Sequence, residues 1–175
     1  MNKIFEKLTN QLTETIDSSV ALALHNKNQE VEVIHLLWAL LTNTNSVLNQ
    51  LLNKMNVNKV AIELEAKSYA SKLPSVSSVT KESIKLSRNL VSSLQNAEGL
   101  MASFGDKFIA VDTWLISNLD SSVIKDVLGK YVDLKEAKKE LEAMRAGKTI
   151  DSNSGDENLE ALNKYGIDLN KKAID

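Results

Sequence analysis

The segment from Val31 to Leu41, VEVIHLLWALL, constrains the fold of this sequence more than any other stretch. Only Glu32 and His35 interrupt its apolar residues, so it lacks the polar face of a surface helix and must be enclosed on nearly all sides. It is too short to span a bilayer, which takes about 20 apolar residues. We therefore predict that it forms the central helix of a compact soluble core.

A second segment, FIAVDTWLISNL from Phe108 to Leu119, repeats this pattern 78 positions later. Apolar residues at steps of three and four precede each copy, and the first such run predicts a helix from Phe5 to about Leu24. Duplicated units with matching apolar faces can pack on each other. The sequence thus predicts an all-α fold, a compact bundle of about eight helices built from two pseudo-twofold related four-helix repeats. The repeats span about residues 1–74 and 79–147.

Polar side chains mark the expected starts of the helices. Five of them are placed to act as N-caps: Ser46, Asn58, Thr80, Asp112 and Asp133. Around Thr80, the apolar Val79 and Ile84 fit a hydrophobic staple, so we expect the first helix of the second repeat to begin there. The last core helix is expected to stop at Gly147.

The composition changes after Gly147. Residues 148–156, KTIDSNSGD, are mostly polar, and we expect them to form a mobile linker. Residues 157–175 recover a few apolar positions, too few to fold alone. They predict the poorly ordered start of a following module, which would make the chain a fragment of a longer protein.

Charge and composition exclude several classes of function. At 43% apolar and 25% charged residues, the chain can bury a globular core. With a formal net charge of -2, the chain lacks the excess of basic residues that binding to nucleic acid or to an anionic membrane surface requires. Without cysteine, disulfides and zinc-thiolate sites are impossible. The N-terminus has no signal-peptide core, so we expect a cytosolic protein.

No local motif predicts catalysis or a metal site. The run Gly147-Lys148-Thr149 resembles the tail of a phosphate-binding loop, but Glu142 stands where that loop needs glycine, and a helix C-cap is favoured. His25 and His35 lack metal-ligand spacing. We expect His35 to be a core histidine with one hydrogen-bond partner.

One region could bind a partner, the loop-to-helix junction of the second repeat. Asp106 and Asp112 flank Phe108-Ile109 there, and Trp114 follows. A turn and an N-cap, each worth about 1 kcal/mol, are enough to explain the two carboxylates, and core packing explains the tryptophan. In the alternative interpretation, the carboxylates form an exposed acidic rim beside an apolar groove, suited to gripping a basic or unfolded peptide.

Two sets of residues carry a resemblance to a known family. The run LTNQLTETIDSSVALALHNKNQEVEVIHLLWALL, followed by the second copy with GDKFIAVDTWLI, resembles the N-terminal domain of the Clp/Hsp100 unfoldases over residues 1–147. The later stretch ALNKYGIDL, Ala161 to Leu169, resembles the junction that leads into the first ATPase module of the ClpB-type members.

The resemblance implies the client-binding domain of a hexameric, ATP-dependent disaggregase. Such a protein extracts unfolded or aggregated client proteins together with the Hsp70 system. ATP and magnesium would bind in ATPase modules beyond this chain, so no cofactor, nucleic acid or membrane partner and no catalysis are expected of it. The isolated chain is expected to be monomeric.

The resemblance also implies a set of client-binding residues. In this sequence they are Thr9, Asp106 and Asp112, together with an apolar groove lined by Leu90, Leu94, Leu100, Thr113 and Trp114. Thr113 departs from the apolar residue that relatives place there. Two alternatives remain open: an adaptor-docking domain of a ClpA- or ClpC-type, protease-associated unfoldase, and a free-standing helical enzyme with a dispersed active site.

Overall fold

Two sets of four helices follow one another along the chain, as the repeated apolar pattern predicts. The computed structural model describes residues 3–155. The first set is α1 (Asn10–His25), α2 (Val33–Thr42), α3 (Val47–Lys54) and α4 (Lys59–Ser71), and the second is α5 (Arg88–Phe104), α6 (Val111–Asn118), α7 (Ser122–Val127) and α8 (Leu134–Arg145). A short 3₁₀ helix, η1 (Lys3–Lys7), precedes α1, and the two-residue strands β1 (Glu30–Val31) and β2 (Lys85–Leu86) precede α2 and α5.

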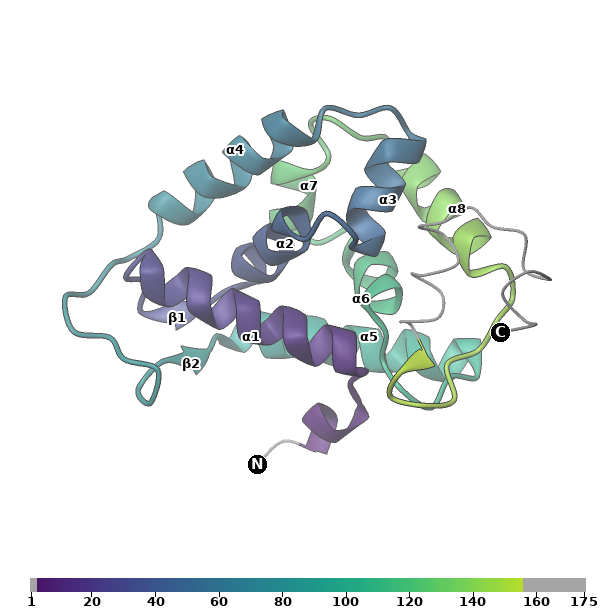
Figure 1. Cartoon of the computed structure of the whole chain (residues 1–175), viewed down its shortest axis with the longest axis horizontal. Coiled ribbons are helices and arrows are strands. Elements are labelled where there is room, and N and C mark those ends of the chain that lie inside the picture. Colours follow the sequence, from purple (N-terminus) through teal and green to yellow (C-terminus); the bar gives the residue numbers. More distant parts are fainter. Residues whose placement is uncertain (1–2, 156–175) are drawn as a thin grey trace.

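The central apolar helix is enclosed as predicted. Every residue of α2 from Val33 to Leu41 is buried, and its counterpart α6 buries Trp114 and Leu115 completely. In Figure 1, α2 and α6 lie in the middle of the molecule, with α1 and α5 along the base and α4 and α8 on the two upper flanks. The core therefore sits where the two repeats meet.

The repeats pack with exchanged partners, as a twofold axis requires. Helix α3 packs on α6 while α7 packs on α2, and α4 contacts α7 while α8 contacts α3. The backbone pairings follow the same rule. Leu8, before α1, pairs in parallel with Ile109, before α6, and Val31, before α2, pairs in parallel with Leu86, before α5. Equivalent residues here are 78 positions apart, the spacing of the two apolar segments. The predicted pseudo-twofold bundle is confirmed.

These cross-repeat pairings correct two predicted helix starts. The hydroxyl of Thr80 accepts a hydrogen bond from the N–H of Ser83 (3.2 Å), but this makes only a turn. Helix α5 begins after Ser87, because Lys85 and Leu86 must stay extended to pair with β1. Likewise the helix predicted from Phe5 is interrupted before Thr9, which caps α1. The caps predicted at the starts of three other helices are confirmed: Ser46, Asn58 and Asp133.

The chain after α8 packs on the domain, where the composition predicts a mobile linker. Ile150 is only 1% exposed, and its carbonyl accepts a hydrogen bond from the N–H of Lys107 (2.8 Å). The first repeat has a comparable contact after α4, although its direction is reversed: the N–H of Val76 donates to the carbonyl of Lys27 (2.8 Å). The packed domain thus extends beyond Gly147 to include Ile150. The module start predicted at residues 157–175 lies outside the described residues.

Candidate functional site

The two predicted site carboxylates, Asp106 and Asp112, converge on the guanidinium of Arg145, the last residue of α8. Asp112 accepts from Nη2 (2.8 Å) and Nε (2.9 Å) of Arg145 in a two-pronged ion pair, and Asp106 accepts from Nη1. The Thr113 hydroxyl accepts from Nη2 (3.1 Å), and the guanidinium lies over the Phe104 ring, 4.7 Å from its centre. Sequence reasoning missed Arg145, whose only signal was a basic residue in the last turn of a helix.

This cluster is buried, so the exposed acidic rim is wrong for this chain. Asp106 and Asp112 are each 6% exposed and Arg145 is 4% exposed. Asp112 does not cap α6 either, because Ala110 occupies the N-cap and Asp112 lies within the first turn. Two carboxylates face one guanidinium, and the N–H of Ile150 donates to Asp106 Oδ1 (2.8 Å), which satisfies part of the excess negative charge.

The neighbours of Arg145 stabilise its charged form. Burial alone would lower the pKa of Arg145, but the hydrogen bonds and charges of Asp112 and Asp106 outweigh burial and raise that pKa above its ordinary value. Arg145 therefore keeps its positive charge at every physiological pH. The cluster ties the loop between α5 and α6 to the end of α8.

Most of the other predicted site residues are also inside the molecule. Four of the five predicted groove residues are fully buried: Leu90, Leu94, Thr113 and Trp114. The Trp114 indole N–H donates to the hydroxyl of Ser93 (2.9 Å), so its polar atom is satisfied within the core. Thr9 is fully buried too, and its hydroxyl accepts from the N–H of Leu12 (3.2 Å) as the cap of α1. Only Leu100 reaches the surface, so this groove lining is wrong for the other four residues.

A surface groove does exist on the second repeat, one face away from the predicted one. We call it the second-repeat groove, with a volume of about 690 Å³ and a lining drawn from α5 to α8. Apolar side chains supply part of its wall: Leu100, Ile116, Leu119 and Leu134. Charged side chains stand on its rim: Asp120, Lys125, Lys135, Lys138 and Glu142. Small and polar residues complete it: Asn96, Gly99, Ser103 and Ser117.

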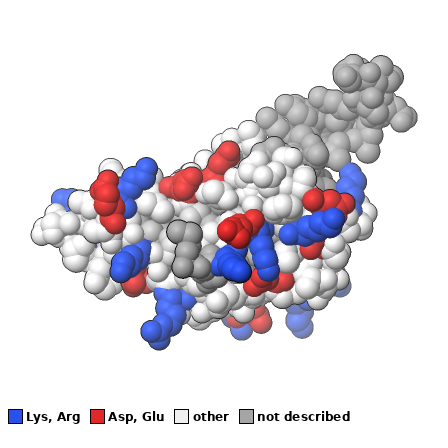
Figure 2. Space-filling view, turned by 90° about the horizontal axis from the view of Figure 1, so that it is seen from below, with Lys and Arg blue, Asp and Glu red and all other residues white. Residues whose placement is uncertain are grey.

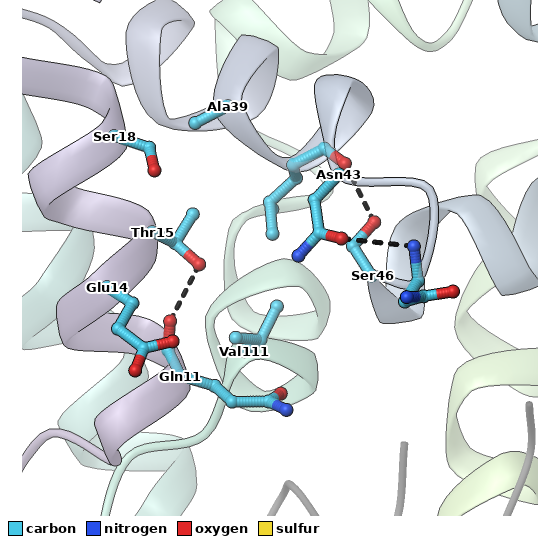
Figure 3. Close-up of a pocket in the computed structure, with 10 residues that line it drawn as sticks. Gln11, Glu14, Thr15, Ser18, Ala39, Asn43, Ser46 and Val111 are labelled. Atoms are coloured by element: carbon cyan, nitrogen blue, oxygen red, sulfur yellow. Dashed lines mark hydrogen bonds between the residues drawn. The ribbon is translucent and has the colours of Figure 1, made fainter. Parts of the chain in front are cut away.

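A smaller pocket, lined mainly by the first repeat, shares two equivalent positions with this groove. Figure 3 shows this first-repeat pocket, in which Glu14, Thr15 and Ser18 of α1 face Ala39 and Asn43. Its volume is about 280 Å³. Positions 18 and 39 correspond, 78 residues on, to positions 96 and 117 of the second-repeat groove. Of these two pockets, the second-repeat groove is the larger and the more apolar.

His35 is a core histidine, as predicted, but with two partners. Its Nδ1 accepts from the N–H of Glu32 (2.8 Å), which leaves the proton on Nε2 to be donated to Asn28 Oδ1 (2.8 Å). Burial lowers the pKa of His35 from 6.5 to about 4. The ring is therefore neutral at pH 7, and both of its nitrogens already have hydrogen-bond partners. Its role is structural.

The described residues offer few other binding features. On the face in Figure 2, lysine and arginine side chains are interspersed with aspartate and glutamate, and no field of one sign covers it. Within residues 3–155, no group of histidine, aspartate and glutamate side chains could hold a metal ion. The same residues include no helix long and apolar enough to cross a membrane.

Comparison with known sequences identifies the family. Residues 7–131 match the family described as Clp repeat (R) N-terminal domain. The chain belongs to this family. Chaperone protein ClpB of Wolinella succinogenes is 56% identical to it over 171 residues, and that of Helicobacter hepaticus is 51% identical over 172 residues. Each alignment covers 98% of this Clp N domain but 20% of the relative, so the chain spans about a fifth of these chaperones.

Solved structures share the fold of this Clp N domain at low sequence identity. The Hsp104 N-terminal domain from Candida albicans has a TM-score of 0.77 at 22% identity, covering 86% of this chain and 99% of that one. The N-domain of ClpV from Vibrio cholerae has a TM-score of 0.65 at 19% identity, covering 83% and 89%. A complex of the ClpV N-domain with a VipB peptide also matches, at a TM-score of 0.62 and 19% identity over 83% of this chain and 91% of that one.

Proposed function

We propose that this Clp N domain binds unfolded or aggregated client polypeptides for a ClpB-type chaperone. The second-repeat groove carries the proposal. Its volume of about 690 Å³ lies within the range of roughly 300–1,000 Å³ that is typical of ligand sites. An unfolded chain displays apolar side chains that a folded protein hides, so a groove with apolar walls can select it without reading a sequence.

The relatives support this function. The two ClpB proteins that exceed 50% identity are named chaperones, and a ClpV N-domain of the same fold is known in complex with a peptide. In the proposal, the whole protein is a cytosolic hexameric disaggregase that works with the Hsp70 system. ATP and magnesium would act in its ATPase modules, and this domain would deliver clients to them. Binding by one domain would be weak, and six copies would raise it through effective concentration.

The buried residues of the predicted site would act indirectly. Asp106, in the α5–α6 loop, and Asp112, in the first turn of α6, both bond to Arg145 at the end of α8. Helices α5, α6 and α8 all line the second-repeat groove. Thr9 fixes the start of α1 against Ile109, since its N–H donates to the carbonyl of that residue (3.0 Å). Changes at these positions would weaken client binding through the shape of the groove.

Titration with a permanently unfolded protein tests the proposal. Leu100→Ser removes an apolar group from the groove, and we expect about tenfold weaker binding. Leu22→Ser is the matched control, since Leu22 is the half-buried equivalent residue on α1 and lies outside the groove. Circular dichroism checks that both variants stay folded. No binding by the parent chain, or equal loss in both variants, contradicts the proposal.

Adaptor docking is the second candidate. The observation in its favour is the ClpV N-domain complex, in which the partner is a defined VipB peptide. A domain of this kind would bind one folded or linear partner tightly and unfolded proteins no better than folded ones. The same titration separates the two functions when a folded version of the client is included.

A further inference from the structure

The rim of the second-repeat groove is richer in cations than in anions. Lys125 comes from α7, and Lys135 and Lys138 come from α8. Two carboxylates share the rim, Asp120 and Glu142. Within residues 3–155, no carboxylate forms an ion pair with any of the three lysines. Their ammonium groups are exposed and available to a ligand in the groove.

Helix α8 sorts its charges between two sides. Lys135, Lys138 and Glu142 line the groove, at the spacing of residues that share one helix face. Glu136, Lys139 and Glu140 do not line it, and Glu136 pairs with Lys139 (3.7 Å). The side toward the groove thus has more lysine than glutamate, and the other side has the reverse. This arrangement differs from the whole chain, whose net charge is -2.

The carboxylates expected to attract basic clients cannot offset these lysines. Asp106 and Asp112 are buried and bonded to Arg145, so neither carboxylate is exposed to a client. The field that a client meets at the groove is set by the rim side chains instead.

We propose that the second-repeat groove prefers apolar segments that carry acidic residues, with Lys125, Lys135 and Lys138 as the groups that select them. Apolar side chains of the segment contact Leu100, Ile116, Leu119 and Leu134, and its carboxylates meet the lysine ammonium groups at the rim. This preference rests on the proposed client-binding function. An exposed acidic rim would instead select segments that carry basic residues.

Two synthetic peptides test the preference. Both carry the same apolar centre, one flanked by glutamates and the other by lysines, and each is titrated into the chain by fluorescence anisotropy. Exposed ion pairs are individually weak, so we expect the glutamate-flanked peptide to bind about three- to tenfold more tightly at low salt. The difference should shrink at about 0.5 M salt, where charges at the rim are screened.

Neighbouring lysines on α8 provide matched variants. Lys138→Glu reverses a charge on the rim and should abolish or invert the preference, whereas Lys139→Glu makes the same change outside the groove and should preserve it. Equal binding of the two peptides to the parent chain, or tighter binding of the lysine-flanked one, overturns the preference while leaving client binding intact. Failure of both peptides and of the unfolded protein to bind overturns the proposed function and the preference with it.

Discussion

At the scale of single residues, each repeat closes the loop before its central helix with a buried polar contact. In the first repeat Asn28 bonds His35 and donates to the carbonyl of Pro74 (3.3 Å), and in the second Asp106 bonds Arg145 and the N–H of Ile150. Asn28 and Asp106 are equivalent positions, 78 residues apart. The same loop is thus fixed by neutral groups in one repeat and by charges in the other.

Arg145 should be essential for stability. Its removal leaves two carboxylates buried without a counter-charge, and breaking such a buried pair costs about 3–5 kcal/mol. We expect Arg145→Met to lower the free energy of unfolding by that amount in a denaturant titration. Arg88→Met, at an exposed position of α5, is the control and should change stability by less than about 0.5 kcal/mol. Similar values for the two variants would contradict the role of the cluster.

His35 should make stability depend on pH. Its pKa is about 4 in the folded protein and 6.5 in the unfolded one, so only the unfolded chain takes up this proton between those values. The free energy of unfolding should therefore fall as pH falls from about 6.5 toward 4, by roughly 3 kcal/mol from this group. In His35→Gln this part of the dependence should vanish, whereas His25→Gln, at an exposed position, should keep it. A pH profile of His35→Gln that matches the parent would contradict the assignment.

At the scale of elements, the sequence correctly predicts the helix starts that local hydrogen bonds determine. It misses those that depend on contacts between the two repeats. The caps at Ser46, Asn58 and Asp133 are correct because each side chain bonds its own helix. Thr80 is an equally good local cap, but its turn does not continue into a helix because Lys85 and Leu86 are extended and pair with Glu30 and Val31. Local sequence patterns do not reveal such contacts between segments that are far apart in the chain.

The segment after α8 shows the same limit and allows a test. Its polar composition predicts a linker, yet burial of Ile150 ties it to the α5–α6 loop. In Ile150→Ala the lost packing should release the segment, and hydrogen exchange at the Lys107 amide should accelerate because its acceptor is the Ile150 carbonyl. The Val76 amide, which makes the comparable contact in the first repeat, should exchange as before. Rapid exchange of Lys107 in the parent chain would show that the segment does not pack in solution.

At the scale of the whole molecule, the fold could be predicted from the sequence but the surface of the site could not. The spacing of Leu90, Leu94 and Ala97 marks the core stripe of α5, and all three are buried. Asn96, Leu100 and Ser103 form a second stripe at the same spacing, and these line the groove. Apolar periodicity reveals the first stripe, whereas the second becomes visible only when α6 and α8 are placed beside it.

The exchanged packing of the repeats predicts that neither repeat folds alone. A chain of residues 1–78 would expose the faces that α2 and α3 bury against α7 and α6, and Val31 would lose its strand partner Leu86. We expect the full chain to unfold in one cooperative thermal transition and the half chain to show little helix by circular dichroism. Adding residues 79–155 to the half chain should restore helix, because each half supplies the surface that the other lacks. A half chain that is fully helical and melts cooperatively by itself would show that the two repeats are independent domains.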